Sequence, residues 1–148
     1  MDETDIAILR LLQSDARLPY ADIGVKVGLA SSSVTERIKK LTAQKTLKRW
    51  TVQLDHDALG FGLLAFVMVL IDQPKQGQAF IDRLKLIPEI QECHHVTGEW
   101  SYLLKIRTQS IGHLESLLSD NIQTIKGVSR TMTTITLSTP KETGLMPF

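Results

Sequence analysis

The sequence predicts an α+β protein built in two parts. Before residue 46 the apolar residues recur at helical spacing, and after residue 61 strand-like apolar runs alternate with helical patterns. A short alternating stretch separates the two parts, and 148 residues are enough for two small domains. We therefore expect a winged-type helix-turn-helix at 1–46, a linker strand and hinge at 47–60, a sheet domain at 61–141 and a tail at 142–148.

The helix-turn-helix rests on two helical segments joined by a glycine-containing turn. Pro19 suits the first turn of the first segment, and Gly28 stands where a left-handed residue would end it. The polar run Ser31–Ser33 opens the next segment, which carries a core-facing stripe spaced by four and three: Val34, Ile38 and Leu41. An earlier helix, capped by Thr4 or Asp5, has a similar apolar face. This arrangement is typical of a helix-turn-helix.

Basic residues concentrate in the second segment of this pair and just after it. The stretch 36–50 holds six basic residues and one acidic residue, although the net charge of the whole chain is only +1. A basic stretch indicates a nucleic-acid partner, but a solvated helix face is the more common reason for one. Charge alone therefore leaves both interpretations open.

The second part of the sequence alternates strands and helices. Strands are expected at 63–72, 90–96, 102–107 and 128–138, and helices at 79–87 and 110–122. The order β-α-β-β-α-β is the ferredoxin-like pattern. The stretch Leu47–Leu54 alternates imperfectly, and we expect it to be a further strand that links the two domains.

The first strand of this domain predicts a partner subunit. Its two sides are formed by two apolar sets: Leu64, Phe66, Met68 and Leu70 on one, and Ala65, Val67, Val69 and Ile71 on the other. The helices can cover only one side of the sheet, and a second copy of the chain is the simplest cover for the other.

Cysteine content and apolar runs favour a cytoplasmic protein. The single cysteine excludes an internal disulfide framework and suits a reducing compartment. Three of the first five residues, Asp2, Glu3 and Asp5, are acidic, unlike the basic start of a signal peptide. The longest apolar run, 61–71, is shorter than the ~20 residues that a membrane-spanning helix needs, so we expect no membrane partner.

Taken in order, these motifs resemble the Lrp/AsnC (leucine-responsive regulatory protein/asparagine regulator) family of transcription regulators. The resemblance rests on these segments: Asp5–Leu9, Asp15–Arg17, Asp22–Leu29 followed by Val34–Leu41, Val96–Lys105, and Gly127–Val128 with Thr131–Thr134. It implies a DNA-binding helix-turn-helix joined to an effector-sensing domain that forms dimers, often assembled into octamers. It also implies small effectors, commonly amino acids, bound in clefts between protomers.

Three positions depart from the family pattern. Ala30 stands where the family usually has a Ser that caps the recognition helix, and Ser31 can take over the cap with a shifted start. Lys45 stands where a Gly usually ends that helix. Ser101 replaces an Asp that the family often uses near its effector, so the sequence predicts weak amino-acid binding or a different effector.

The expected contacts with double-stranded DNA lie on the second helix of the pair. Specific binding needs phosphate neutralisation and contact with base edges. The candidate residues are Ser32, Ser33, Thr35, Arg37, Lys39 and Lys40. Arg37 can read guanine, or it can form a structural ion pair with Glu36 or Asp22. The serines can bind phosphate at the helix start, or they can serve only as caps.

The expected effector contacts lie in the segment that resembles the family's most recognisable loop and in the last strand. They are Gly98, Glu99, Trp100, Ser101, Tyr102, Thr131, Thr133 and Thr134. Glu99 is the acid nearest to the missing Asp and can meet an ammonium group. The threonines offer hydroxyls, although their strand propensity alone can explain their presence.

Alternative functions rest on weaker signals. Cys93 and His95 share one side of an expected strand and His94 faces the other, which disfavours a metal site built from the three. The histidines also leave open an enzyme with the architecture of tetrapyrrole decarboxylases. A non-specific architectural DNA-binding protein is a further alternative. No grouping of nucleophile, base and orienting residue occurs, so we expect no catalytic residue, no metal and no cofactor.

Overall fold

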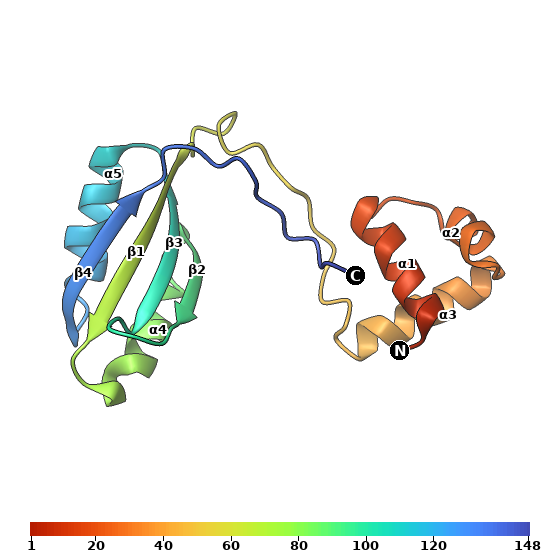
Figure 1. Cartoon of the computed structure of the whole chain (residues 1–148), viewed down its shortest axis with the longest axis horizontal. Coiled ribbons are helices and arrows are strands. Elements are labelled where there is room, and N and C mark those ends of the chain that lie inside the picture. Colours follow the sequence, from red (N-terminus) through yellow and green to blue (C-terminus); the bar gives the residue numbers. More distant parts are fainter. The chain divides into compact units, whose positions relative to one another are not determined.

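The computed structural model describes all 148 residues, and the chain divides into two compact units (Figure 1). Residues 1–53 form the first unit together with residues 142–148, and residues 54–141 form the second. The tail joins the first unit through Gln13, whose side-chain oxygen accepts a hydrogen bond from the Met146 N–H at 2.7 Å.

The first unit consists of three helices, α1 (Glu3–Ser14), α2 (Tyr20–Val27) and α3 (Ser31–Ala43). Helix α1 begins with a reciprocal cap: the Asp5 N–H donates to the Asp2 carboxylate at 2.8 Å, and the Asp2 N–H donates to the Asp5 carboxylate at 3.0 Å. The prediction that Thr4 or Asp5 caps this helix is therefore wrong. Asp2 lies in extended backbone just before the first turn, as a capping residue must.

Two glycines shape the turn between α2 and α3. Gly28 has a φ of 70°, the left-handed conformation that was expected of it, and its N–H donates to the Gly24 carbonyl. A Cβ on Gly24 would lie 2.5 Å from the Leu29 carbonyl oxygen, so only glycine permits this close approach of turn and helix. The helices enclose a shared core: Ile8, Leu12, Ile23, Val34 and Ile38.

The start of α3 and the segment that follows it differ from what the sequence predicts. The capping position is Ala30, without any side-chain cap, and Ser31 is already the first helical residue. Segment 47–54 forms no strand, because no other strand of the chain lies alongside it, and the first unit therefore lacks the strands of a wing. Lys45 has a φ of 59°, a left-handed conformation that costs a non-glycine residue ~1–2 kcal/mol.

The second unit has the expected β-α-β-β-α-β order. Its strands are β1 (Leu63–Ile71), β2 (Ile90–His95), β3 (Tyr102–Thr108) and β4 (Val128–Ile135). The helices are η1 (Pro74–Gln76) running into α4 (Gly77–Leu84), and α5 (Ile111–Ser116) continued by the π-helical stretch η2 (Leu117–Ile122). The sheet has the strand order β2-β3-β1-β4, and every neighbouring pair is antiparallel.

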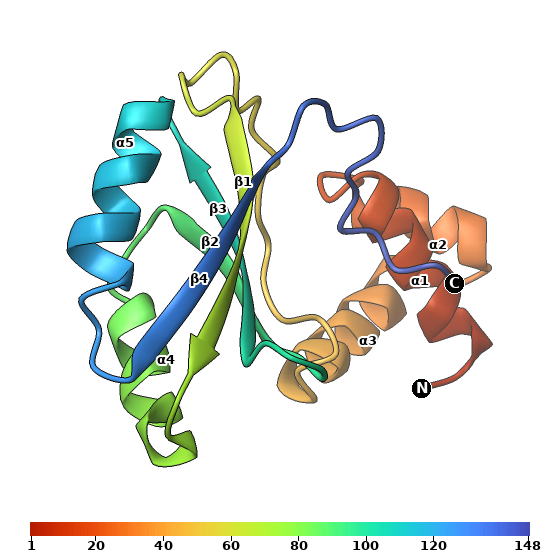
Figure 2. The same cartoon turned by 60° about the vertical axis from the view of Figure 1, so that its left-hand side comes forward.

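The helices cover one face of this sheet and leave the other open (Figure 2). On the covered face, Ala65, Val67 and Val69 of β1 are fully buried, and they pack in one cluster with residues of both helices. On the open face, Phe66 is 36% exposed, and Met132 on the neighbouring strand is 48% exposed. The two apolar sides of β1 thus have different surroundings within one chain.

Candidate DNA-binding helix and ligand-binding loop

Helix α3 presents its polar side chains on the surface opposite its core stripe. Ser32, Ser33, Lys39 and Lys40 are exposed, whereas Val34 and Ile38 are buried. Because no side chain caps α3, the N–H groups of its first turn have no side-chain acceptor. Free N–H groups, the positive end of the helix dipole and nearby cations together favour phosphate.

Two candidate residues of α3 are engaged in interactions with their own helix. The Thr35 hydroxyl donates to the Ser31 carbonyl at 2.9 Å. Lys39 forms an ion pair of 2.8 Å with Glu36, which raises the pKa of Lys39, and both side chains are largely exposed. An exposed pair of this kind contributes little to stability, so Lys39 can exchange its partner for a phosphate.

Arg37 ties α3 to the start of α1. Its guanidinium donates to Asp2 and to Asp5, each at 2.7 Å, rather than to Glu36 or Asp22. The hydrogen bond from Arg37 lowers the pKa of Asp2. The pKa of Asp5 is lowered by the hydrogen bond from the Asp2 backbone N–H and also by the hydrogen bond from Arg37. The same side chain cannot at once hold both carboxylates and reach a base, so in this conformation Arg37 orients the helix.

The loop between β2 and β3 uses Ser101 within the sheet. Gly98 has a φ of 107°, which fits its predicted role in a tight turn. The Ser101 hydroxyl accepts a hydrogen bond from the Ile71 N–H at 3.1 Å, and the Ser101 N–H donates to the Val69 carbonyl at 2.9 Å. The Ser101 hydroxyl oxygen is therefore already an acceptor for the backbone at the end of β1, and a ligand would have to share it.

Arg130 is the residue of this loop region that sequence reasoning missed. It forms an ion pair with Glu99, and its guanidinium carbon lies 4.6 Å from the centre of the Trp100 ring. The cation–π geometry and the ion pair connect the start of β4 to the loop. No spacing pattern marks Arg130 in the sequence, because the connection depends on how β4 pairs with β1.

The remaining candidates of this site are separated by the sheet. Residues directly opposite each other on antiparallel strands point to the same face. Thr131 and Thr133 are opposite Val69 and Val67 on the helix-covered face, whereas Thr134 is opposite Phe66 on the open face. Thr131 also accepts a hydrogen bond from the Gln123 amide at 3.1 Å. The three hydroxyls therefore do not converge on one ligand within a single chain.

Tyr102 belongs to the core rather than to the loop surface. Its side chain is buried, and its ring centre lies 5.1 Å from the ring centres of both Phe80 and His95. A Cβ on Gly77 would lie 2.7 Å from the Tyr102 oxygen, which shows how closely α4 covers this ring. Four of the expected effector contacts lie in the loop between β2 and β3: Gly98, Glu99, Trp100 and Ser101.

The other titratable residues of the sheet form no metal centre. No group of three or more His, Cys, Asp or Glu side chains is arranged to hold a metal ion. The register places Cys93 and His95 on one face and His94 on the other, as expected, and His94 lies 2.9 Å from Glu92. None of the helices is both long and apolar enough for a bilayer crossing.

A helix-turn-helix with a polar, basic second helix, followed by a sheet domain with a polar loop, defines a class: transcription regulators with a carboxy-terminal ligand-binding domain. Family models agree with this division of the chain. Residues 1–42 match the AsnC-type helix-turn-helix domain, and residues 64–146 match the Lrp/AsnC ligand-binding domain.

Individual relatives cover almost the whole chain. The HTH-type transcriptional regulator FL11 of Pyrococcus horikoshii is 38% identical over 99% of this chain and 96% of its own length. The regulatory protein AsnC of Haemophilus influenzae is 31% identical over 95% and 93%. A regulator of Neisseria meningitidis, solved as a complex with L-methionine, has a TM-score of 0.93 at 27% identity, over 99% of this chain and 96% of that one. The chain belongs to the Lrp/AsnC family of transcription regulators.

Proposed function

We propose that this regulator binds specific sites on double-stranded DNA in the cytoplasm through α3, and that a small metabolite bound near the loop 96–102 changes this binding. The observation that carries the DNA proposal is the uncapped, exposed start of α3, with Ser32 and Ser33 there and Lys39 and Lys40 further along one surface. Thr35 lies between these groups, and Arg37 supports the surface by fixing the helix against α1.

In vitro selection from random duplexes tests sequence-specific binding. Full-length protein is used to select duplexes, and the affinity for the selected duplex is compared with that for a scrambled duplex of the same composition at one salt concentration. Sequence-specific regulators bind their sites about 10³-fold or more tighter than other DNA. Equal affinities for the two duplexes would favour the architectural alternative instead.

We propose that the effector is an amino acid, and that it binds where the polar groups of the loop already have partners. The L-methionine complex of the Neisseria regulator supports this class of ligand. In this chain Glu99 is already paired with Arg130, and the Ser101 hydroxyl already accepts from Ile71. An ammonium group must compete with Arg130 for Glu99, so amino acids are expected to bind weakly. Trp100 supplies the apolar surface for the ligand side chain.

A thermal-shift panel of the common amino acids tests this proposal. A ligand that binds only the folded protein raises the apparent stability in proportion to the logarithm of its concentration relative to Kd. An amino acid at millimolar concentration should raise Tm slightly. The Glu99→Gln variant, which changes an exposed side chain, should lose this increase. A submicromolar Kd for an amino acid in the unmodified protein would contradict the weak-binding account.

The open face of the sheet supports self-association. It carries Phe66 and Met132, both partly exposed, on the face that no helix covers. Segment 47–54 also exposes apolar side chains at every second position, at Trp50, Val52 and Leu54. This pattern suits a strand that pairs with a strand of a second copy of the chain. We expect a homodimer and a higher assembly such as an octamer, and light scattering that reports a monomer at micromolar concentration would refute this.

No catalytic role is part of this proposal. The histidines that suggested a tetrapyrrole enzyme have other contacts: His94 lies 2.9 Å from Glu92, and His95 packs on Tyr102. An absorbance titration with an iron tetrapyrrole distinguishes the two functions. The regulator is expected to leave the tetrapyrrole spectrum unchanged, whereas ligation by a histidine would shift it.

A further inference from the structure

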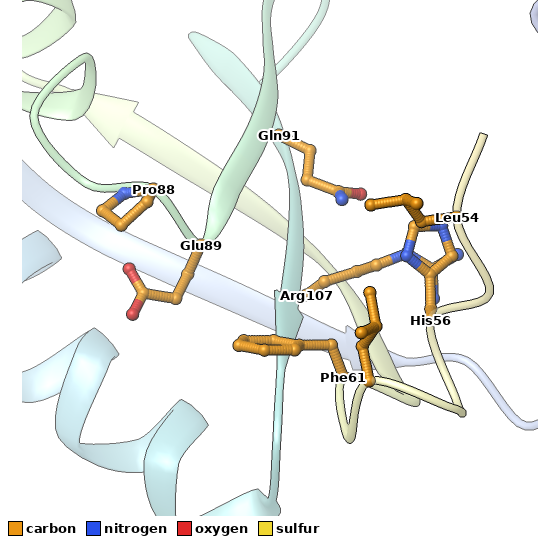
Figure 3. A pocket seen from close by; sticks show the side chains of 8 residues that line it. Leu54, His56, Phe61, Pro88, Glu89, Gln91 and Arg107 are labelled. Atoms are coloured by element: carbon orange, nitrogen blue, oxygen red, sulfur yellow. The ribbon is translucent and has the colours of Figure 1, made fainter. Parts of the chain in front are cut away.

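The positively charged side chains of this chain fall into two groups, those with a partner and those without. Arg107 lines a cavity of about 320 Å³ where β2 starts and β3 ends (Figure 3), but it is only 7% exposed and already has an interaction partner. The segment after α3 is different. Lys45, Lys48 and Arg49 are all exposed, and none of them forms an ion pair or a side-chain hydrogen bond. The proposed DNA-binding surface of α3 ends at Lys40 and leaves these three cations without a role.

No acidic residue lies near these cations in the sequence. Between Glu36 and Asp55 the chain holds six basic residues and no acidic one. Only Arg37 and Lys39 among the six have carboxylate partners, which come from the start of α1 and from Glu36. Exposed like charges without acids among them repel each other, so they do not stabilise the fold, and they suit an anionic partner.

The turn after α3 holds this segment in a defined place. The N–H groups of Thr46 and Leu47 both donate to the Leu41 carbonyl, at 3.0 and 3.2 Å. The Lys45 N–H donates to the Thr42 carbonyl at 2.9 Å. This is the pattern of a Schellman cap, in which the chain turns away after the last helical residues. The Leu47 side chain then packs against the core of the three helices, so the chain on both sides of it is held at the end of α3.

Lys45 occupies the position of this turn that favours glycine. Its φ of 59° is left-handed, and the other residues of the chain with a positive φ are all glycines. Glycine would form the same cap without strain, so the cap alone does not account for a lysine here. Strain of this kind is concentrated at functional sites. The helix dipole also favours a cation at a helix end, but its effect is confined to the last turn and does not extend to Lys48 and Arg49.

The length of α3 brings its end close to the DNA backbone whenever its start enters the major groove. The 13 residues of α3 span about 20 Å. The major groove is only about 12 Å wide. A helix that inserts its first turn between the two backbones therefore has its last turn near the phosphates that line the groove.

From these features we infer that the turn 44–49 is a second phosphate-binding surface, in which Lys45, Lys48 and Arg49 contact the backbone of the duplex whose bases α3 reads. The inference rests on the proposed DNA binding and adds a part that does not depend on sequence. Phosphate contacts contribute affinity and position the protein, whereas base contacts discriminate between sequences. Three such contacts steepen the slope of log K against log salt by about three units, because each releases counterions from the DNA.

Lys45→Gly separates the phosphate contact from the cap, because the two effects have opposite signs. Relief of the left-handed strain should raise Tm by about 2–4 °C. Loss of the cation should weaken binding of the selected duplex about threefold and reduce the salt slope by about one. Lys45→Arg keeps the charge and should keep both the affinity and the slope. A Lys45→Gly protein with a raised Tm and unchanged affinity would assign Lys45 to the cap alone and overturn its place in this surface.

The other two cations are tested together by fluorescence anisotropy of the full-length protein at several salt concentrations. Lys48→Gln with Arg49→Gln should weaken binding of the selected and the scrambled duplex by the same factor, about tenfold, and reduce the slope by about two. Lys75→Gln with Lys126→Gln removes two exposed cations of the second unit and is the matched control, which should change neither quantity. An unchanged slope in the first double variant, or a loss confined to the selected duplex, would overturn the inference.

Failure of this inference is distinguishable from failure of the proposed function. Lys39→Ala with Lys40→Ala reports on the surface of α3 itself. If that variant loses affinity and the variants of the turn 44–49 do not, DNA binding through α3 stands and the second surface is refuted. If the unmodified protein binds neither duplex, the proposed function and the inference fail together.

Discussion

The surface of α3 and the loop 96–102 are both polar, but they differ in what their polar groups already contact. On α3, the serines at the helix start and Lys40 face water, and the Lys39 pair is exposed. In the loop region, Glu99 is bound to Arg130 and the Ser101 hydroxyl is bound to the backbone of β1. The first surface can contact a phosphate directly, whereas a ligand at the second must replace existing interactions.

This difference follows from how a helix and a loop satisfy their backbone hydrogen-bonding groups. A helix in a three-helix core needs few of its exposed side chains for support, because its own backbone satisfies the N–H and C=O groups outside its end turns. A loop between strands has backbone groups that need partners, and its side chains supply them. A ligand that uses the polar groups of such a loop has to break contacts that already exist there.

The largest expected effect comes from disturbing the support of α3. Gly24→Ala places a methyl group 2.5 Å from the Leu29 carbonyl oxygen and should destabilise the first unit by ~1–3 kcal/mol. Gly112→Ala is the matched control, because its nearest neighbour would be the Ser110 hydroxyl at 4.0 Å, and alanine favours the helix. Denaturant unfolding followed by circular dichroism measures both. Equal stability of the two variants would show that the close approach does not matter.

The next effect concerns DNA affinity. Lys39→Ala with Lys40→Ala should weaken binding ~10-fold for all duplexes and reduce the slope of log K against log salt by ~2, because each lost phosphate contact removes about one unit. Lys75→Ala with Lys126→Ala, two exposed lysines of the second unit, is the control. Fluorescence anisotropy at several salt concentrations gives the slope, and an unchanged slope would remove the α3 lysines from the interface.

A smaller effect is expected at the loop 96–102, where an amino acid is proposed to bind. Ser101→Asp retains an oxygen acceptor for the Ile71 N–H and adds a second acid for an ammonium group. Charge-assisted hydrogen bonds are roughly twice as strong as neutral ones, so the affinity for an amino acid should rise several-fold. Calorimetric titration measures the change, with Ser129→Asp as a control on β4. Loss of amino-acid binding in Ser101→Asp would contradict the assignment of this position.

The smallest effect concerns pH. The pKa values of Asp2 and Asp5 are lowered in the folded chain, so their contribution to stability is present above the ordinary carboxylate pKa. It is lost as the pH falls from that value through the lowered pKa, because in this range the unfolded chain binds protons that the folded chain does not. Arg37→Met should therefore lower Tm at pH 6 more than at pH 3. A constant difference in Tm across this range would mean that the Arg37 pairs do not affect stability.

Sequence periodicity predicts the helices and their faces well, because a single period relates all residues of a helix. It identified the stripe Val34, Ile38 and Leu41 and the exposed lysines of α3. It did not identify the partners of Arg37, since Asp2 and Asp5 reach it only when α1 and α3 pack together. Local spacing carries no information about such tertiary contacts.

Strand periodicity is less informative for the loop 96–102 and the residues around it. Thr131, Thr133 and Thr134 were expected together in one site, whereas the strand register places Thr134 on the opposite face from the other two. Alternation did not reveal Arg130 beside Glu99, because that contact depends on the pairing of β4 with β1. The expected strand at 47–54 alternates imperfectly and has no neighbouring strand within the chain, and a strand needs a partner for its backbone hydrogen bonds.

Hydrogen exchange of the full-length protein tests the difference between the two surfaces most directly. Exchange is followed alone, with the selected duplex and with the tightest amino acid of the panel. We predict that DNA slows exchange in the first turn of α3, at residues 31–34, and that the amino acid slows exchange at residues 96–102. Protection by DNA that leaves the start of α3 unchanged, or amino-acid protection confined to other parts of the chain, would contradict this account.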